Sequence, residues 1–338
     1  MAKRGRATVV DVARAAGVSV GTVSHVLSGR KTVRPETRAR VEQAIRELGF
    51  RPNSIARSLT RQRTQTIGMV VPDVTNPFFA DLIWEVERSL SDAEHAVVFG
   101  NSGNEPQREH AYLESFLARR VDGLIIAITG GADLDFIYEV ASEVPTVFVD
   151  RPVDPVADMV VGDNRAGMAL AIAHLIELGH RRIGFIDGDP ELGTAQERRA
   201  GVEAALAAHG LAPTASSSGQ FTLASGYEQA RTLLTNSRDA TAICTGNDLL
   251  AMGTLTAAAE LGIRIPDDLS LIGYDDITYA AFTSPPLTTV RQPGAAMGEE
   301  TVRLLASRLA AFDGPPRRVV LEPELIVRGS TAAPGAAT

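Results

Sequence analysis

The chain has 338 residues, and 33 Lys and Arg against 41 Asp and Glu give it a formal net charge of −8. This length predicts two or three folded units, and a hydrophobic content of 44% excludes a chain that is disordered throughout. The single cysteine, Cys244, excludes a disulfide framework and a cysteine zinc site, and no apolar run has the roughly 18 residues that a membrane span needs. No signal-type stretch follows the N-terminus, so we expect a cytoplasmic protein without a membrane partner.

The charge is distributed unevenly along the chain. Residues 1–64 hold 14 Lys and Arg and 4 acids, a net charge of 14 − 4 = +10, which leaves −18 for residues 65–338. A basic head on an acidic body favours a head that binds a polyanion, with a solvated basic arm as the alternative.

Residues 1–50 are expected to form three short helices. Thr8 resembles the start of a capping box and Gly17 ends the first helix, the second runs from Val20 to about Leu27, and the third runs from Pro35 to Leu48. Two helices joined by Gly17-Val18-Ser19 are typical of a helix-turn-helix, whose second helix reads DNA. The expected small core consists of Val12, Ala13, Val23, Val26, Leu27, Val41, Ile45 and Leu48.

Residues 51–65 are expected to be a hinge with one short helix, Asn53–Leu59. Isolated helices under about 12 residues rarely persist in water, so this helix would form only when something holds it.

From Thr66 onward, short β-rich runs alternate with amphipathic helices, which predicts βαβ units with buried parallel strands. The pattern is too long for one such sheet, so we expect two Rossmann-like lobes with a cleft between them. Polar residues end several runs, and ligands bind at the carboxyl ends of parallel strands. The expected strands are Ile67–Val71, Ala96–Phe99, Leu124–Ile128, Thr146–Val149, Met159–Val161, Ile183–Ile186, Ala242–Cys244, Leu269–Gly273, Arg318–Leu321 and Glu324–Val327.

The expected core, residues 66–330, divides into lobe 1 (about 66–163 and 291–320) and lobe 2 (about 164–290 and 321–330). The remaining residues, 331–338, are small and are expected to be a disordered tail.

Several motifs in this order resemble those of the lactose/galactose-repressor (LacI/GalR) family. The resemblance covers roughly residues 8–330. Its motifs are Val10–Leu27, Arg51–Leu59, Val71–Phe79, Arg120–Leu124, Gly246–Asp248, Gly273–Asp276 and Pro285–Val290.

The resemblance implies a homodimeric transcription regulator, with an all-α helix-turn-helix head and a periplasmic-binding-protein-like α/β core. Its reading helices would enter the major groove at the two halves of a pseudo-palindromic operator. His25 can donate to guanine and Val20 can contact a thymine methyl, whereas Gly21 has no side chain to offer; plain helix packing is the alternative for Val20. Phosphate contacts are implied for Thr8, Ser19, Thr22 and Ser24.

Within the hinge, the resemblance implies further DNA contacts from Asn53, Ala56, Arg57 and Leu59. Leu59 matches the leucine that wedges into the minor groove, which kinks the DNA. The alternative for Leu59 is the apolar side of a short helix.

The resemblance also implies an effector in the cleft between the lobes. Aromatic rings can stack on a small polar ring, arginine can bind vicinal oxygens, and carboxylates and amides can bind hydroxyls. Asp276 is expected to cap the following turn instead. The implied effector-binding residues are Phe78, Phe79, Asp150, Arg151, Thr194, Arg198, Phe221, Asn247 and Asp275.

A sugar or sugar derivative is the favoured effector, with a nucleoside-type corepressor as the alternative. The purine-binding branch of the family resembles this chain at His25, but it has an arginine where Leu192 stands here. The effector could either induce or corepress.

Two other functions are less compatible with the sequence. A solute-binding protein of a sugar transporter would share the core but has no use for a basic head. An enzyme is disfavoured because no GxGxxG pattern, Walker pattern or G-x-S-x-G elbow follows a predicted strand, and the six histidines lack metal-ligand spacing. We therefore expect no catalytic residues, no cofactor and no metal site.

Overall fold

The structure, a computed structural model, describes residues 7–28, 33–50, 64–91, 95–154, 156–236 and 239–335. The chain divides into two compact units, Met1–Thr64 and Gln65–Thr338, each of which is described by itself. The predicted hinge helix and the hinge contacts Asn53, Ala56, Arg57 and Leu59 lie outside the described residues.

The first unit contains the three predicted helices: α1 (Val9–Ala16), α2 (Val20–Ser28) and α3 (Pro35–Leu48). The predicted capping box is confirmed, because the Thr8 side chain accepts from the Asp11 backbone while the Asp11 carboxylate accepts from the Thr8 backbone. Gly17 ends α1 in the left-handed region at φ 63°, which an L side chain rarely adopts.

The core of this unit is formed by apolar residues from all three helices. One expected core residue is wrong: Leu48 is 40% exposed, because it lies in the last turn of α3, beyond the contacts of Val41 and Ala44.

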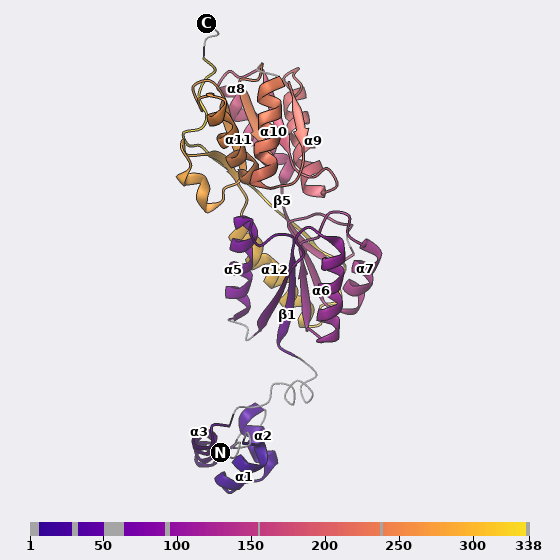
Figure 1. The fold of residues 1–338 in the computed structure, drawn as a ribbon. Coiled ribbons are helices and arrows are strands. Elements are labelled where there is room, and N and C mark those ends of the chain that lie inside the picture. Colours follow the sequence, from indigo (N-terminus) through magenta and orange to yellow (C-terminus); the bar gives the residue numbers. More distant parts are fainter. Residues whose placement is uncertain are drawn as a thin grey trace. The chain divides into compact units, whose positions relative to one another are not determined.

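Lobe 1 is a six-stranded sheet in the order β11-β5-β4-β3-β1-β2, with all pairs parallel. Helices α5 and α12 cover one face and α6 and α7 cover the other (Figure 1). The bounds are β1 Thr66–Val71, α5 Pro77–Ser91, β2 Ala96–Asn101, α6 Pro106–Ala118, β3 Gly123–Ile126, α7 Leu134–Glu143, β4 Thr146–Val149, β5 Asp158–Gly162, α12 Gly294–Leu309 and β11 Arg318–Leu321.

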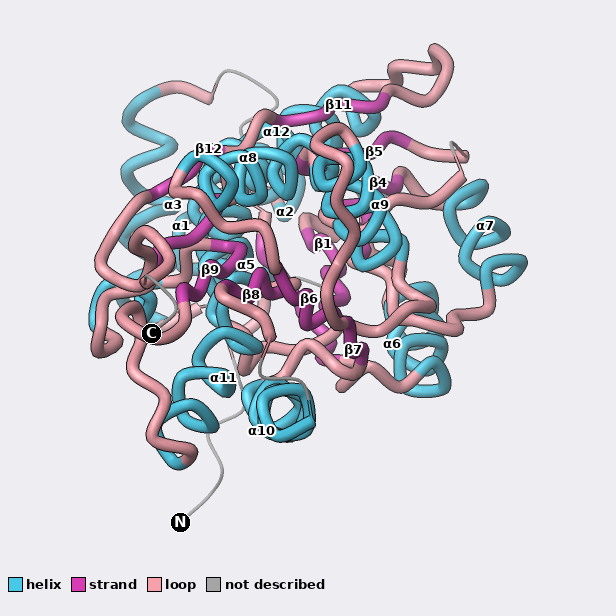
Figure 2. Tube along the Cα trace, turned by 90° about the horizontal axis from the view of Figure 1, so that it is seen from above, coloured by secondary structure: helices cyan, strands magenta, loops and turns pink. Residues whose placement is uncertain are grey.

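Lobe 2 is a second six-stranded sheet in the order β12-β10-β9-β8-β6-β7. Figure 2 shows its strands between the α8/α9 pair and the α10/α11 pair. The bounds are α8 Asn164–Glu177, β6 Ile183–Asp187, α9 Gly193–Ala207, β7 Ser216–Ser218, α10 Leu223–Asn236, β8 Ala242–Thr245, α11 Asp248–Glu260, β9 Ser270–Asp275, the 3-10 helix η1 Thr278–Phe282, β10 Thr288–Arg291 and β12 Glu324–Ile326.

All ten expected strands are present within a few residues of their predicted ends. Two strands were not predicted: β7 consists of three serines, and β10 follows two prolines, so neither has the apolar pattern of a buried strand. The expectation of parallel pairing fails at β12, which pairs antiparallel with β10.

The tail was expected to be disordered from residue 331, and the structure corrects this for residues 331–335. The backbone of Ala332 donates to Ser270 Oγ at 3.0 Å and accepts from His180 at 2.8 Å, while Thr331 contacts His174 at 2.9 Å. Small side chains do not prevent order when the backbone finds fixed polar partners. No helix among the described residues is long and apolar enough to cross a membrane.

Candidate functional site

A cavity lies between the two lobes, at the carboxyl ends of their strands. It brings together all nine residues that the sequence indicated for the effector. Two further residues that the sequence analysis missed also line it, Asn76 and Gln292. Asn76 lies within the family motif Val71–Phe79. Gln292 lies where the chain passes from β10 of lobe 2 to α12 of lobe 1.

Lobe 1 presents two phenylalanines at the start of α5. The side chain of Asn76 accepts from the Phe78 backbone at 3.1 Å, which fixes the beginning of this helix. The rings of Phe78 and Phe79 meet edge to face, with centroids 5.2 Å apart. They give the cavity an apolar wall that can contact the face of a ring.

Asp150 and Arg151 follow β4 directly, and both are buried. Asp150 has a left-handed backbone at φ 65°, a conformation that costs energy and often occurs at functional sites. Its Oδ1 has no hydrogen-bond partner among the described residues. Burial raises the pKa of Asp150, an effect that Arg198 and Arg151 oppose. Arg151 itself donates to the Ile128 carbonyl and lies over the ring of Phe79.

From lobe 2, α9 supplies Thr194 and Arg198. The Arg198 guanidinium is buried and donates from Nε to Asn164 Oδ1 at 2.8 Å and from Nη1 to the Gly246 carbonyl at 2.7 Å. Its Cζ lies 4.0 Å from the ring centroid of Tyr274, and this cation–π contact stabilises the position of the guanidinium group. Its Nη2 lies 3.6 Å from Asp275 Oδ1.

Phe221 reaches the cavity because two glycines make room for its ring. A Cβ on Gly188 would lie 2.1 Å from the ring, and a Cβ on Gly246 would lie 3.1 Å from it. The neighbouring Asn247 caps α11, since its Oδ1 accepts from the Leu250 backbone at 2.9 Å. The amide nitrogen of Asn247 therefore remains as a donor for a ligand oxygen.

Asp275 ends β9 and accepts from Gln292 Nε2 at 2.8 Å. Burial raises its pKa to about 7, while Arg198 and Gln292 oppose the rise. Gln292 Oε1 is a second buried acceptor without a partner among the described residues.

The expected capping role of Asp276 is wrong. Its carboxylate pairs with Arg291 at 2.8 Å and Arg328 at 2.6 Å. The backbone of Ile277 instead donates to the buried Asp248, whose other oxygen accepts from Thr289. Two nearby arginines satisfy Asp276 better than one backbone N–H.

In the helical unit, the residues indicated for DNA lie at the outer face of α2 and at the helix starts. Val23 and Val26 are buried, whereas Val20 is 42% exposed, Gly21 and Ser24 are exposed and His25 is half-buried. Packing in the core therefore does not account for Val20.

The hydroxyls indicated for phosphates partly serve as caps. Ser19 Oγ accepts from the Thr22 backbone at 3.1 Å and contacts the Thr22 hydroxyl at 3.0 Å. Because only one of these two hydroxyls can donate within the pair, the other has a proton for a phosphate oxygen. Thr8 Oγ1 lies 2.7 Å from Asp11 Oδ2, to which it donates.

Comparisons with known proteins agree with this architecture. A family model described as "Bacterial regulatory proteins, lacI family" matches residues 8–53, and one described as "Periplasmic binding protein-like domain" matches residues 172–331. The ribose operon repressor of Escherichia coli (strain K12) is 38% identical over 328 residues, which cover 96% of this chain and 99% of that protein. This chain belongs to the LacI family.

One more relative and one solved structure support membership of this family. The HTH-type transcriptional repressor PurR of Mannheimia succiniciproducens is 36% identical and covers 96% of this chain and 98% of its own length. The structure of the Lac repressor dimer bound to operator and the anti-inducer ONPF has a TM-score of 0.88 at 28% identity, covering 97% of this chain and 100% of that one.

As a member of the LacI family, the chain is a DNA-binding transcriptional repressor and not an enzyme. It binds operator DNA as a homodimer and responds to a small-molecule effector.

Proposed function

We propose that the effector of this LacI-family repressor is a monosaccharide or sugar derivative, bound in the cavity between the lobes. The observation that carries this proposal is the pair of unpartnered buried acceptors, Asp150 Oδ1 and Gln292 Oε1. A buried acceptor without a donor costs free energy, and a ligand with several hydroxyl donors removes that cost.

The other residues of the cavity would serve the same ligand. The rings of Phe78, Phe79 and Phe221 would pack on the faces of the sugar, and Arg198 would donate to neighbouring oxygens. Asn247 would donate to a ring hydroxyl and Asp275 would accept from another. Arg151 and Thr194 would complete the two walls.

A nucleoside-type ligand is the second candidate, because PurR is nearly as similar to this chain as the ribose operon repressor. Position 192 favours the sugar. Leu192 is buried and packs beside Gly130, so this position supplies no charged group for a base.

For the DNA, we propose that Val20 and His25 contact bases while Thr8, Ser19, Thr22 and Ser24 contact phosphates. Gly21 would leave one base without a direct contact. The hinge, residues 51–65, would add Asn53, Ala56, Arg57 and the wedge Leu59. Because operator DNA lies in the cytoplasm, we propose that the repressor acts there.

Effector binding would be coupled to DNA binding through the arrangement of the lobes. One arrangement would bring the two hinges of the dimer together, so that each short helix is held by its partner and by DNA. The effector would favour one arrangement over the other and change operator affinity by about 5–150-fold.

Thermal shift and calorimetry with a ligand panel test the effector class. The panel contains D-ribose, D-galactose, D-glucose, adenosine and hypoxanthine, and we expect a sugar to raise the Tm with increasing concentration. Asp150→Asn should weaken its binding about 10–100-fold, since the amide oxygen accepts more weakly than the carboxylate and the amide NH₂ group replaces one acceptor oxygen. The matched control Asp313→Asn, at an exposed position, should bind normally. Binding of only the nucleoside or base would select the second candidate, and binding of none would contradict the proposal.

A further inference from the structure

Arg198 lines the cavity, and one of its hydrogen bonds is to Asn164, which does not line the cavity. Its Nε donates to Asn164 Oδ1 at 2.8 Å, and both side chains are buried. Asn164 is the first residue of α8, directly after the segment in which the chain leaves β5 of lobe 1. The orientation of the Asn164 amide therefore decides whether the Nε–H of Arg198 has this acceptor.

That orientation is set by two acceptors on the other side of the amide. Asn164 Nδ2 donates to Glu197 Oε2 at 3.0 Å and to the Gly162 carbonyl at 3.3 Å. An amide turned by 180° would place its oxygen against these two acceptors and its NH₂ group against the Arg198 N–H. Glu197 thus keeps the Asn164 oxygen toward Arg198.

Glu197 also reaches the other lobe. It lies on α9 of lobe 2, whereas Arg318 begins β11 of lobe 1, and Glu197 Oε1 lies 3.6 Å from Arg318 Nη2. The side chains are 23% and 50% exposed, so this pair is weak and easily broken. A weak contact of this kind between two lobes costs little to break.

We propose that Glu197 is a positioning residue that couples Arg198 to the arrangement of the lobes. It divides its two carboxylate oxygens between Arg318 of lobe 1 and the Asn164 amide that orients Arg198. When the lobes separate at this edge, Glu197 loses Arg318, and its hold on the Asn164 amide changes. The inference rests on the proposed function in one respect, that Arg198 is an effector contact.

The test observes the Arg198 Nε–H proton in the full-length protein without ligand. Its NMR signal is assigned by its loss in Arg198→Lys, and its exchange with solvent is measured. Glu197→Ala should accelerate the exchange about fivefold, the effect of losing one ordinary hydrogen bond. Glu197→Gln should restore the slow exchange, because its side-chain oxygen still accepts from Asn164.

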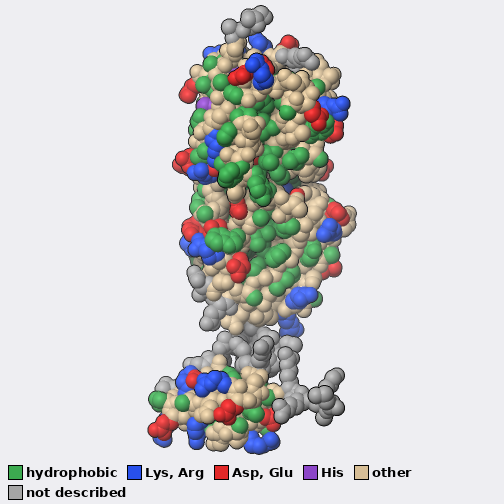
Figure 3. Space-filling model, turned by 60° about the vertical axis from the view of Figure 1, so that its left-hand side comes forward, with side chains coloured by type: hydrophobic (Ala, Val, Ile, Leu, Met, Phe, Trp, Pro, Cys, Tyr) green, Lys and Arg blue, Asp and Glu red, His purple; other side chains and the backbone are tan. Residues whose placement is uncertain are grey.

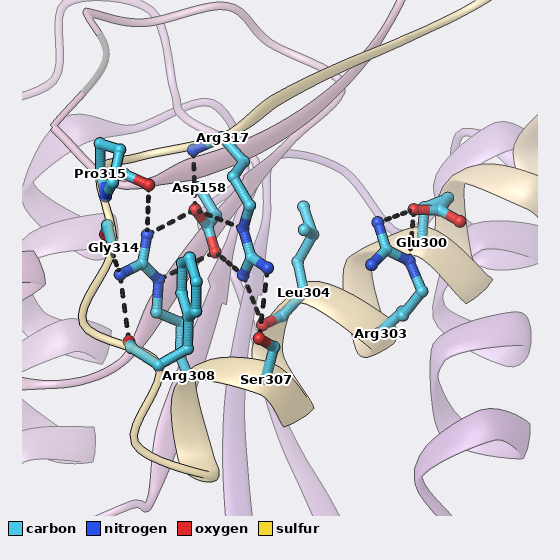
Figure 4. Close-up of polar contacts among 10 residues, drawn as sticks. Asp158, Glu300, Arg303, Leu304, Ser307, Arg308, Gly314, Pro315 and Arg317 are labelled. Carbon is cyan, nitrogen blue, oxygen red and sulfur yellow. Dashed lines mark hydrogen bonds and ion pairs between the residues drawn. The ribbon is translucent and has the colours of Figure 1, made fainter.

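Arg318→Ala tests the connection between the lobes. We expect it to shift the Arg198 signal in the wild-type background but not in the Glu197→Gln background, because Arg318 acts through the carboxylate. The control Glu300→Gln breaks the 2.6 Å pair with Arg303 inside lobe 1 (Figure 4) and should leave the signal unchanged.

Unchanged exchange in Glu197→Ala would overturn the proposal, and so would an equal Arg318→Ala shift in both backgrounds. Neither measurement needs an effector, so a ligand panel without a binder would contradict the sugar proposal and not this one.

Discussion

Gln292 donates its side-chain amide to Asp275 at 2.8 Å, where the chain passes from lobe 2 into lobe 1. The backbone N–H of Gln292 also donates to the Asp275 carbonyl at 3.3 Å. One residue at a crossing between the lobes therefore holds a carboxylate of the proposed effector pocket. The pKa of Asp275 therefore depends on Gln292 at the crossing as well as on burial in the pocket.

Effector affinity should consequently rise with pH around neutrality. Burial raises the pKa of Asp275 to about 7, so its carboxylate is mostly protonated at pH 6 and mostly ionised at pH 8. The ionised form accepts more strongly from a ligand hydroxyl, so affinity at pH 8 should exceed that at pH 6 by up to about tenfold. Calorimetry at several pH values measures this. Asp275→Asn should give weaker binding without the dependence, and a flat wild-type profile would contradict the role of Asp275.

The sequence predicted the pocket better than it predicted the contacts inside it. Residues at the carboxyl ends of strands, such as Asp150 and Asp275, follow from the βαβ pattern, which brings these ends to one edge. Gln292 and Glu197 carry no such signal, because their roles depend on where the chain crosses between the lobes and on which helix faces which strand. The small-residue tail looked unstructured since its backbone partners are distant in sequence.

Leu59 provides a prediction about the DNA complex that depends on the sequence alone. If this side chain wedges between base steps, Leu59→Ala should weaken binding to a specific operator far more than to random DNA. The salt dependence of binding to random DNA should stay unchanged, because phosphate contacts set it. Fluorescence anisotropy with an operator selected in vitro measures both. Equal losses on the two DNAs would reject the wedge.

Phe282 provides a prediction about the homodimer. This residue of η1 is 81% exposed, and Tyr279 on the same turn is 57% exposed. Figure 3 shows hydrophobic side chains gathered over both lobes on one face of the core. Exposed apolar surface of this kind is typical of an interface, so Phe282→Glu should shift the dimer toward monomer at micromolar concentration. Sedimentation velocity tests this against Leu134→Glu, on α7. Equal effects from both variants would contradict a specific role for η1.

Asp158 provides a prediction about stability, at the start of β5, where it does not line the cavity. Its buried carboxylate accepts from the guanidinium groups of Arg308 and Arg317 and from the Arg317 backbone (Figure 4). Arg308 also donates to the carbonyls of Gly314 and Pro315. The cluster thereby fastens the loop between α12 and β11 to the start of β5.

Asp158→Asn should lower the free energy of unfolding by about 2–4 kcal/mol at pH 7, because two partly buried arginines lose their counter-ion. Despite the cost of burial, the two arginines lower the pKa of Asp158 to about 2. A lowered pKa stabilises the fold above the ordinary value of 3.8, and this contribution is lost as pH falls toward 2. The difference between wild type and variant, measured by urea unfolding, should therefore shrink to about half at pH 3.

Asp268 is the matched control for this prediction. Its pairing with Arg264 also lowers its pKa to about 2, but that pair lies at the surface, where solvent screens the charges. Asp268→Asn should therefore lower the unfolding free energy at pH 7 by less than Asp158→Asn does. A comparable loss in both variants would show that the pKa shift alone, and not the burial of the carboxylate between two arginines, determines the stability of this edge.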